Sequence, residues 1–271
     1  MNFNINKNSQ SQYQGYLHTP VLWKNTVFGL KQFEFSTEKE TVFNESIPEN
    51  LRLGKCVERF VSSELQQNKE ITILIENIQV QNEKITVGEI DCILKHNNRP
   101  IHLEIIYKFY LFNDSIGTTE IEHWIGPNRN DTLLKKLTKL KEKQLPLLYN
   151  PLTKPLLDNL SLKADEVQQV VCFKAQLFVP YQKEVEFMEL NKACINGFYI
   201  TISEISQFTD CKFFIPSKIN WLLEVRTQVK WLNYNLFSEK VTSIINEKTS
   251  PLCWIKFPNG NIQKFFVVWW S

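Results

Sequence analysis

Residues 88–112 read GEIDCILKHNNRPIHLEIIYKFYLF, and this stretch says most about the fold. Two apolar, β-branched runs are separated by residues 96–99 (HNNR), which favours a hairpin between two strands. Side chains alternate between the two faces of a strand, so Glu104 and Lys108 share one face of the second strand. If the two strands pair, Asp91 of the first strand and Glu104 of the second can converge near one point on the sheet.

The flanking residues extend this pattern into an ordered α/β unit. Apolar residues at helical spacing predict a helix that ends near residue 68, and they are Leu53, Val57, Phe60, Val61 and Leu65. Strands are expected over residues 71–79, 84–95, 100–112 and 167–179. A second helix, capped by Asn130 or Asp131, is expected to end at Pro146. We therefore predict an α/β core of helix, three-stranded antiparallel meander, helix and parallel strand, with a mixed sheet.

The chain divides into three expected regions. Residues 1–50 form an N-terminal segment, of which the first 16 or so are polar and frayed and residues 17–28 form one or two short helices. Residues 51–180 form the α/β core. Residues 181–271 form an aromatic-rich α+β extension packed on the core. Within the extension we expect strands at 197–202 and 212–215, a helix over 221–231, and a hairpin around residues 258–261.

Composition narrows the class of protein without identifying it. The chain has 271 residues, a hydrophobic fraction of 43% and a net charge of +2, as in a folded globular protein. Its six cysteines are scattered, which favours buried free thiols over a zinc site or a disulfide framework. The polar N-terminus lacks a signal peptide's apolar core, and no apolar run reaches the roughly 20 residues of a membrane helix. We expect a soluble, cytoplasmic protein without a membrane partner. Phosphate-binding glycine loops, a G-x-S-x-G elbow and an H-E-x-x-H pair are missing from the sequence.

Asp91 and Glu104 are the residues that could carry chemistry. Two converging carboxylates could hold a hard cation such as Mg²⁺, which takes few protein oxygens and keeps several waters. The metal would polarise a phosphodiester, and a lysine could orient the attacking water. Spacing alone favours the alternative, a solvated sheet face that carries acidic residues and a lysine. His102, two residues before Glu104, could join a metal shell, although we favour a hydrogen-bonded structural histidine.

The motifs also resemble a known family. They are Gly88-Glu89-Ile90-Asp91, the strand from Glu104 to Lys108, Trp124-Ile125-Gly126-Pro127-Asn128 with Asp131, and the helix from Lys135 to Gln144. This set is similar to an uncharacterised bacterial family, a domain of unknown function, that is placed by fold analogy among PD-(D/E)XK nuclease-like proteins. The likeness covers about residues 50–150. It implies that Asp91 and Glu104 bind Mg²⁺ or Mn²⁺, that Lys108 is the catalytic lysine, and that Glu58 on the first helix assists the metal.

One spacing departs from that pattern. The usual signature is E-x-K, whereas here Glu104 and Lys108 are separated by three residues and by roughly 13 Å of strand. A bulge in the strand could shorten the gap. Alternatively, Lys135 or another lysine of the second helix could substitute, or catalysis could have been lost. All three outcomes stay open at the level of sequence.

The second helix offers a basic face for nucleic acid. Its lysines include Lys135, Lys136 and Lys139, which could track phosphates or could simply form a solvated surface. Gln144 resembles a glutamine that follows the core in some DNA-end-processing nucleases. The leading hypothesis is a Mg²⁺-dependent nuclease or phosphodiesterase that acts on nucleic acid, DNA rather than RNA. The alternatives are an inactive nuclease-fold module that binds nucleic acid or protein, and an assembly protein that uses its aromatic C-terminal part.

Overall fold

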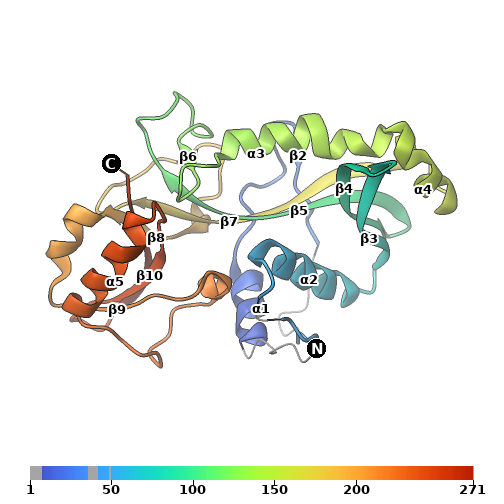
Figure 1. The fold of residues 1–271 in the computed structure, drawn as a ribbon. Coiled ribbons are helices and arrows are strands. Elements are labelled where there is room, and N and C mark those ends of the chain that lie inside the picture. The colour runs from blue at the N-terminus through green and yellow to red at the C-terminus, as the bar shows by residue number, and fades with distance from the viewer. Residues whose placement is uncertain (1–7, 36–41, 49, 271) are drawn as a thin grey trace.

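A large mixed β-sheet runs through the part of the chain that the computed structural model describes, residues 8–35, 42–48 and 50–270 (Figure 1). Its strand order is β3-β4-β5-β7-β8-β11-β10-β9, and β6 pairs with β5 beside this path. The strands are β3 (Ile71–Asn82), β4 (Ile85–His96), β5 (Arg99–Phe112), β6 (Trp124–Ile125), β7 (Gln168–Pro180), β8 (Ile195–Thr201), β9 (Lys212–Phe214), β10 (Leu252–Lys256) and β11 (Ile262–Val268). The predicted mixed α/β sheet is therefore present.

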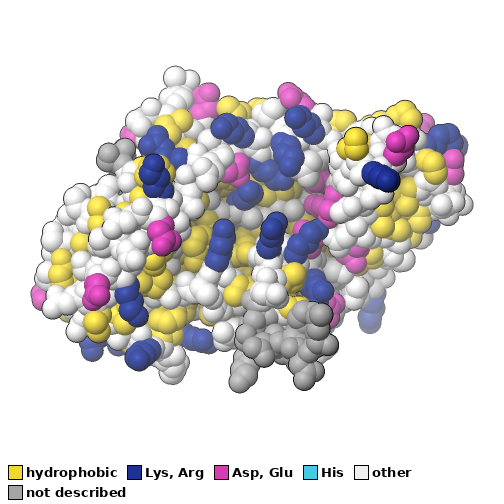
Figure 2. Space-filling view, in the orientation of Figure 1, with side chains coloured by type: hydrophobic (Ala, Val, Ile, Leu, Met, Phe, Trp, Pro, Cys, Tyr) yellow, Lys and Arg dark blue, Asp and Glu magenta, His cyan; other side chains and the backbone are white. Residues whose placement is uncertain are grey.

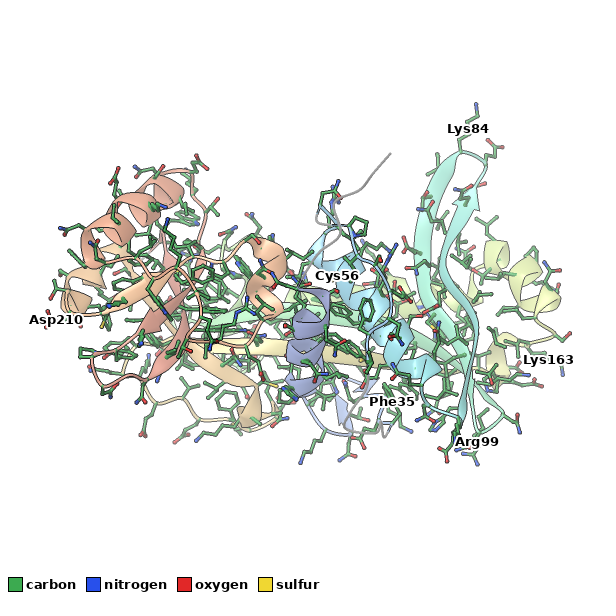
Figure 3. All side chains as sticks on the ribbon, turned by 90° about the horizontal axis from the view of Figure 1, so that it is seen from below. Phe35, Cys56, Lys84, Arg99, Lys163 and Asp210 are labelled. Carbon is green, nitrogen blue, oxygen red and sulfur yellow. The ribbon has the colours of Figure 1, made fainter. Side chains whose placement is uncertain are left out.

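The expected meander of β3, β4 and β5 is antiparallel throughout. Asn97 and Asn98 both have positive φ, 49° and 65°, as a two-residue hairpin turn between twisted strands requires. The next long strand, β7, lies parallel to β5 in one unbroken register from Ile101↔Gln168 to Leu111↔Phe178. Seen from below, the β3–β4 hairpin projects from the body of the molecule, with Lys84 at its tip (Figure 3).

Helices cover both faces of this part of the sheet (Figure 1). Below it lie α1 (Ser9–His18) and α2 (Leu53–Gln66), and α2 buries Val57, Phe60 and Val61 as its apolar spacing predicted. Above it runs α3 (Leu133–Lys139), whose N-cap is Thr132 rather than the expected Asn130 or Asp131, because the Thr132 side chain accepts from the Lys135 N–H. The layers bury most of β5 and the second half of β4, where Ile90, Cys92, Ile93 and Leu94 are buried.

The helix above the sheet does not end at Pro146. It continues from α3 through a π-helical turn (η1, Leu140–Gln144) and a 3₁₀ turn (η2, Leu145–Tyr149), and Pro146 lies in the first turn of η2, where the helix changes from π to 3₁₀ geometry. The end of this helix packs on β4. A Cβ at Gly88 would come within 2.8 Å of the Leu147 side chain, so glycine permits this close approach.

The remaining helical segments lie after η2 in the chain. They are α4 (Lys154–Asn159), α5 (Tyr234–Asn246), and the 3₁₀ turns η3 (Pro151–Thr153), η4 (Ala164–Glu166), η5 (Lys192–Cys194), η6 (Ile202–Phe208) and η7 (Lys218–Leu222). The C-terminal strands continue the main sheet, with β8 and β11 parallel and the expected β10–β11 hairpin. The helix expected over 221–231 is wrong, because only η7 is helical there. Instead α5, with Phe237, Val241 and Ile245 buried, covers the C-terminal strands.

The N-terminal region differs most from expectation. Ser9–His18 form α1, although this segment is polar, because Tyr13 and Tyr16 are fully buried and their rings lie 5.4 and 6.0 Å from that of Phe60. The short helices expected at 17–28 are wrong. A small hairpin of β1 (Thr26–Val27) and β2 (Leu30–Lys31) lies there. Residues 1–7 of the segment expected to fray lie outside the described residues.

Two further expectations concern the cysteines and the membrane. All six cysteines are buried free thiols, as their scattered positions indicated. A search of the described residues finds no helix with both the length and the apolar character needed to cross a bilayer.

Close packing of α1 against η7 gives a test of the fold. A Cβ on Gly15 would lie 1.9 Å from the Leu222 carbonyl oxygen, which is backbone and cannot rotate away. Gly15→Ala should therefore lower the free energy of unfolding by about 2 kcal/mol or more, measured by urea denaturation. Gly54→Ala is the matched control, because nothing lies within 4 Å of its Cβ position in α2. It should raise stability by roughly 0.5–1 kcal/mol. Equal effects of the two variants would contradict the packing.

Candidate functional site

The site begins where β4 and β5 separate. Their pairing runs from His96↔Arg99 to Cys92↔Leu103 and ends there. In the same register the next pair would be Asp91 and Glu104. Instead of a backbone bond, the Asp91 Oδ2 accepts from the Ile105 N–H at 2.9 Å. The Asp91 carboxylate thus replaces a backbone acceptor, and the charge of Glu104 acts on Asp91, as expected for two carboxylates that lie near each other.

Glu104 is held from two sides and is fully buried. The His102 Nε2 lies 3.1 Å from Glu104 Oε1, and the Gln144 amide donates to Glu104 Oε2. The Gln169 amide donates to His102 Nδ1 and to the Leu145 carbonyl, so the ring proton is assigned to Nε2, which donates to Glu104. His102 is therefore the structural histidine that we favoured, and its role is to fix a carboxylate.

Glu58 reaches the same region from α2, below the sheet. Its carboxylate pairs with Lys55 at 2.7 Å, and Lys55 also bonds Glu89 on β4 and the Asn77 side chain on β3. The lysine ammonium is thus surrounded by oxygens from three elements. The charges of Glu89 and Glu104 act on Glu58, which places it near the carboxylate pair.

The electrostatics of the cluster show an excess of negative charge. Burial, the charge of Glu104 and that of Glu58 raise the pKa of Asp91 to about 7, against the lowering effects of the Ile105 N–H and Lys136. Burial also raises the pKa of Glu58, although Lys55 opposes the shift. The raised pKa values mean that Asp91 and Glu58 are poorly compensated as anions, so a cation could take the place of the bound proton.

Lys108 does not point at the carboxylates. Its ammonium lies 2.6 Å from Asp131 Oδ2, and both side chains are about one-third exposed. The bulge that could have moved it toward Glu104 is missing, since the β5–β7 register has no shift over the described strands. The sequence left three possibilities open, and the first of them, a bulge in β5 that brings Lys108 to Glu104, is not observed in the described strands.

Lys136 of α3, rather than Lys108, is linked to the carboxylate cluster. Its Nζ donates to Gln144 Oε1 at 2.8 Å, and Gln144 in turn donates to Glu104. Burial and the nearby Lys108 and Lys139 lower the pKa of Lys136 to about 8, whereas Glu104 and Asp91 oppose the shift. Gln144 thus lies inside the cluster. Lys135 and Lys139 are exposed on the same helix.

Lysine and arginine side chains gather on one face of the molecule. Figure 2 shows them on both sides of a hollow that crosses the face below α3, with acidic side chains at one end. A polyanion laid in the hollow would meet positive charge on two sides.

Sequence reasoning missed part of this constellation. Lys55 and Gln169 carried no signal, because their roles depend on contacts between separate elements. Asp131 did belong to the motif set that resembled a family, but its partnership with Lys108 could not be inferred. The hydrogen bond from Lys136 to Gln144 depends on the π-helical turn that ends at Gln144. Such turns are often found at functional sites.

A model of a domain of unknown function (DUF1853) matches residues 10–268. The chain belongs to this family. No curated protein and no solved structure matches the chain significantly. The family spans the C-terminal strands as well as the core, well beyond the residues 50–150 that carried the resemblance.

The raised pKa of Asp91 yields a stability test. Ionising Asp91 costs more in the folded than in the unfolded chain, so its contribution to stability falls as the pH rises from 4 to 7. Asp91→Asn keeps an acceptor for the Ile105 N–H and removes that cost. Without metal, the variant should exceed the wild type by about 2–4 kcal/mol at pH 7.5.

The gain should shrink as the pH falls toward 4, in urea denaturation at several pH values. Asp131→Asn is the matched control, because it loses the ion pair with Lys108 and should gain nothing. A destabilised Asp91→Asn protein at pH 7.5 would contradict the assigned electrostatics.

Proposed function

We propose that the protein is a metal-dependent nuclease of the PD-(D/E)XK type that cleaves phosphodiester bonds of nucleic acid, DNA rather than RNA. The observation that carries this proposal is the pair Asp91 and Glu104 at the parting of β4 and β5. The order of α2, the β3–β4–β5 meander, α3 and the parallel β7 supports it. These are the elements that the resemblance implies for a nuclease-like core.

The donor set fits Mg²⁺ or Mn²⁺. Among the described residues no group of three or more His, Cys, Asp or Glu side chains forms a ready metal cage. Mg²⁺ does not need one, because it is commonly bound by one or two carboxylates together with waters and substrate phosphates. Asp91 and Glu104 would hold it, with Glu58 assisting. A bound ion would polarise the phosphodiester and lower the pKa of the attacking water.

The protein's own residues would orient the reaction. His102 and Gln144 fix Glu104, so this carboxylate need not reorganise on binding. Lys136 would hold the attacking water and take part in proton transfer, which its lowered pKa and its link to Glu104 through Gln144 support. Lys108 instead holds Asp131. Lys135 and Lys139 would contact phosphates of the bound strand.

Cleavage should depend on both carboxylates. Purified protein with Mg²⁺ or Mn²⁺ should cut single- or double-stranded DNA in a gel assay, with RNA substrates as the comparison. Asp91→Asn and Glu104→Gln should each reduce the rate by about 100-fold or more, as expected when a metal-binding charge is lost. Asp158→Asn, on exposed α4, is the control and should leave the rate unchanged. Cleavage that survives in both site variants would sink the assignment.

The two lysines can be separated in the same assay. Lys136→Met should lower the rate by about 100-fold, in the range of a lost acid–base or water-orienting group. Lys135→Met, one position away and exposed, should change it less than tenfold. Lys108→Met should fall between these values, because its loss frees Asp131. If Lys108→Met is inactive and Lys136→Met is not, the catalytic lysine is Lys108, in a rearranged complex.

A second candidate function follows from the Lys108–Asp131 pair, which leaves the usual lysine away from the carboxylates. The protein would then be an inactive nuclease-fold module that binds nucleic acid or protein. Binding of a DNA oligonucleotide should in that case be equal in EDTA and in Mg²⁺ and should weaken with salt. Metal-induced thermal stabilisation that disappears in Asp91→Asn would favour the nuclease instead.

A further inference from the structure

A second polar site lies on another part of the sheet, around Lys264 of β11. This lysine is only 4% exposed. Its Nζ donates to the Gln176 Oε1 at 3.0 Å and to the Trp221 carbonyl oxygen at 2.9 Å. Both acceptors are neutral, and no ion pair joins Lys264 to a carboxylate in the described part of the chain. An ammonium group has three N–H donors, so one donor of Lys264 has no acceptor in the described residues.

Burying a cation without a counter-ion is costly. Burial lowers the pKa of Lys264 to about 7, and the charge of Glu224 offsets this only in part. The Glu224 carboxylate is engaged elsewhere, because it lies 2.7 Å from the His18 Nδ1. The two hydrogen bonds of Lys264 occupy two of its three N–H donors, so the amine can still donate to a ligand from outside the chain.

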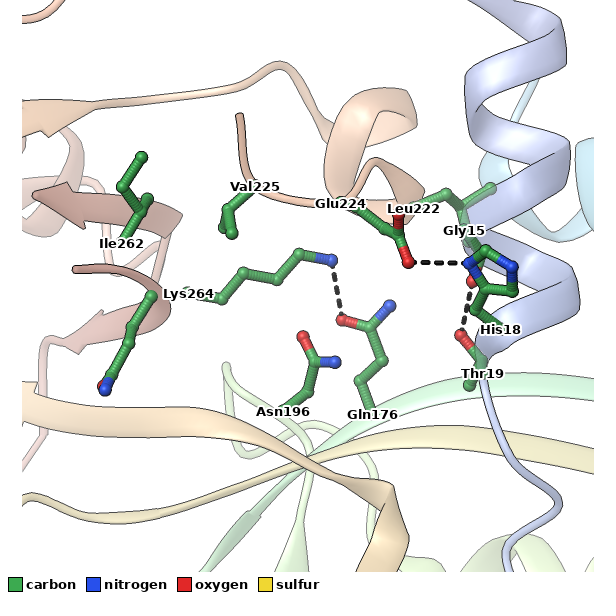
Figure 4. A pocket seen from close by; sticks show the side chains of 11 residues that line it. Gly15, His18, Thr19, Gln176, Asn196, Leu222, Glu224, Val225, Ile262 and Lys264 are labelled. Atoms are coloured by element: carbon green, nitrogen blue, oxygen red, sulfur yellow. Dashed lines mark hydrogen bonds and ion pairs between the residues drawn. The ribbon is translucent and has the colours of Figure 1, made fainter. Parts of the chain in front are cut away.

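The amine lies at the wall of a pocket of about 410 Å³. Residues from α1, β7, β8, β11 and the segment after η7 line it, and Figure 4 shows Lys264 running across it with its ammonium beside Gln176. The Asn196 amide is directed into the same space and makes no hydrogen bond with the described residues (Figure 4). The volume is within the range of small-molecule sites, roughly 300–1,000 Å³, and is too small for a macromolecule.

The pocket wall is rigid on the side that holds Lys264. The Gln176 Nε2 donates to the Tyr107 hydroxyl at 2.8 Å, Tyr107 donates to Thr19, and Thr19 donates to the Gly15 carbonyl oxygen. Gln176 therefore presents its oxygen, not its nitrogen, to Lys264. Tyr107 lies on the face of β5 opposite to Glu104, so this pocket is separate from the carboxylate cluster.

We propose that this pocket binds a small organic or inorganic oxyanion, with a carboxylate or phosphate group as the counter-ion of Lys264. The remaining N–H of Lys264 and the Asn196 amide donate to the oxyanion. Val225 and Ile262 offer an apolar wall for the rest of an organic ligand. Because the pocket joins the N-terminal helix to the C-terminal strands, a bound anion would also stabilise that junction. This site does not depend on the nuclease proposal.

Calorimetric titration of the full chain with inorganic phosphate and with acetate tests the site, at constant ionic strength set by chloride. Saturable binding of one anion per chain is expected for at least one of them, and the tighter one identifies the acidic group. Lys264→Met should weaken binding at least tenfold. Lys240→Met, an exposed lysine of α5, is the matched control and should bind as the wild type does.

A second measurement needs no variant at the site. The pKa of each lysine can be followed through its ¹³Cε resonance, with Lys136→Met used to assign the other lysine of low pKa. The anion should raise the pKa of Lys264, because a nearby negative charge favours the ammonium form. The other titratable groups that face the pocket are His18 and Glu224. Non-saturable effects of both anions, or a Lys264 resonance that does not respond to either, would overturn the proposal.

Discussion

The hydrogen bond from the Ile105 N–H to the Asp91 carboxylate is the interaction on which the carboxylate site depends. Backbone pairing between β4 and β5 stops at Cys92 and Leu103, and a side chain satisfies the next donor of the ladder. β4 stays paired with β3 on its other side along its whole length, and its Gly88 packs against Leu147 at the end of the upper helix. The separation of the two strands admits groups from both layers, Glu58 from below and Gln144 with Lys136 from above.

Such a cluster is expensive for the folded chain. Asp91, Glu104 and Glu58 repel one another in a partly dry environment, and only part of this is offset by Lys55 and Lys136. The surrounding polar groups nonetheless hold the cluster in one arrangement, because Gln169 orients His102 and His102 orients Glu104. Like-charged side chains that are held close together in spite of their repulsion are typical of a binding or catalytic site. Such a site lowers the stability of the fold but can accept a cation. Lys264 is a comparable case, because burial lowers the pKa of its amine and no carboxylate of the described residues pairs with it.

Much of the core followed from local sequence. Asn97-Asn98 predicted the hairpin because asparagine tolerates positive φ, and the two-residue alternation then placed Asp91 and Glu104 together. The features that local sequence did not predict depended on distant contacts. The polar α1 is helical because its tyrosines pack on Phe60, which residues 9–18 alone do not reveal. The sequence predicted that the helix ends at Pro146, whereas a π-helical turn and a 3₁₀ turn continue it. Lys108 shares a strand with Glu104, but Asp131 from a later loop determines where its ammonium lies.

We propose that the carboxylates at the point where β4 and β5 separate form a divalent-cation site. A crystal of the protein soaked in Mn²⁺, measured at a wavelength where manganese scatters anomalously, tests it most directly. We expect one anomalous peak between Asp91 and Glu104, at metal–oxygen distances of roughly 2.0–2.3 Å. A map with no peak there, in which Lys136 and Gln144 keep their contacts with each other and with Glu104, would contradict it.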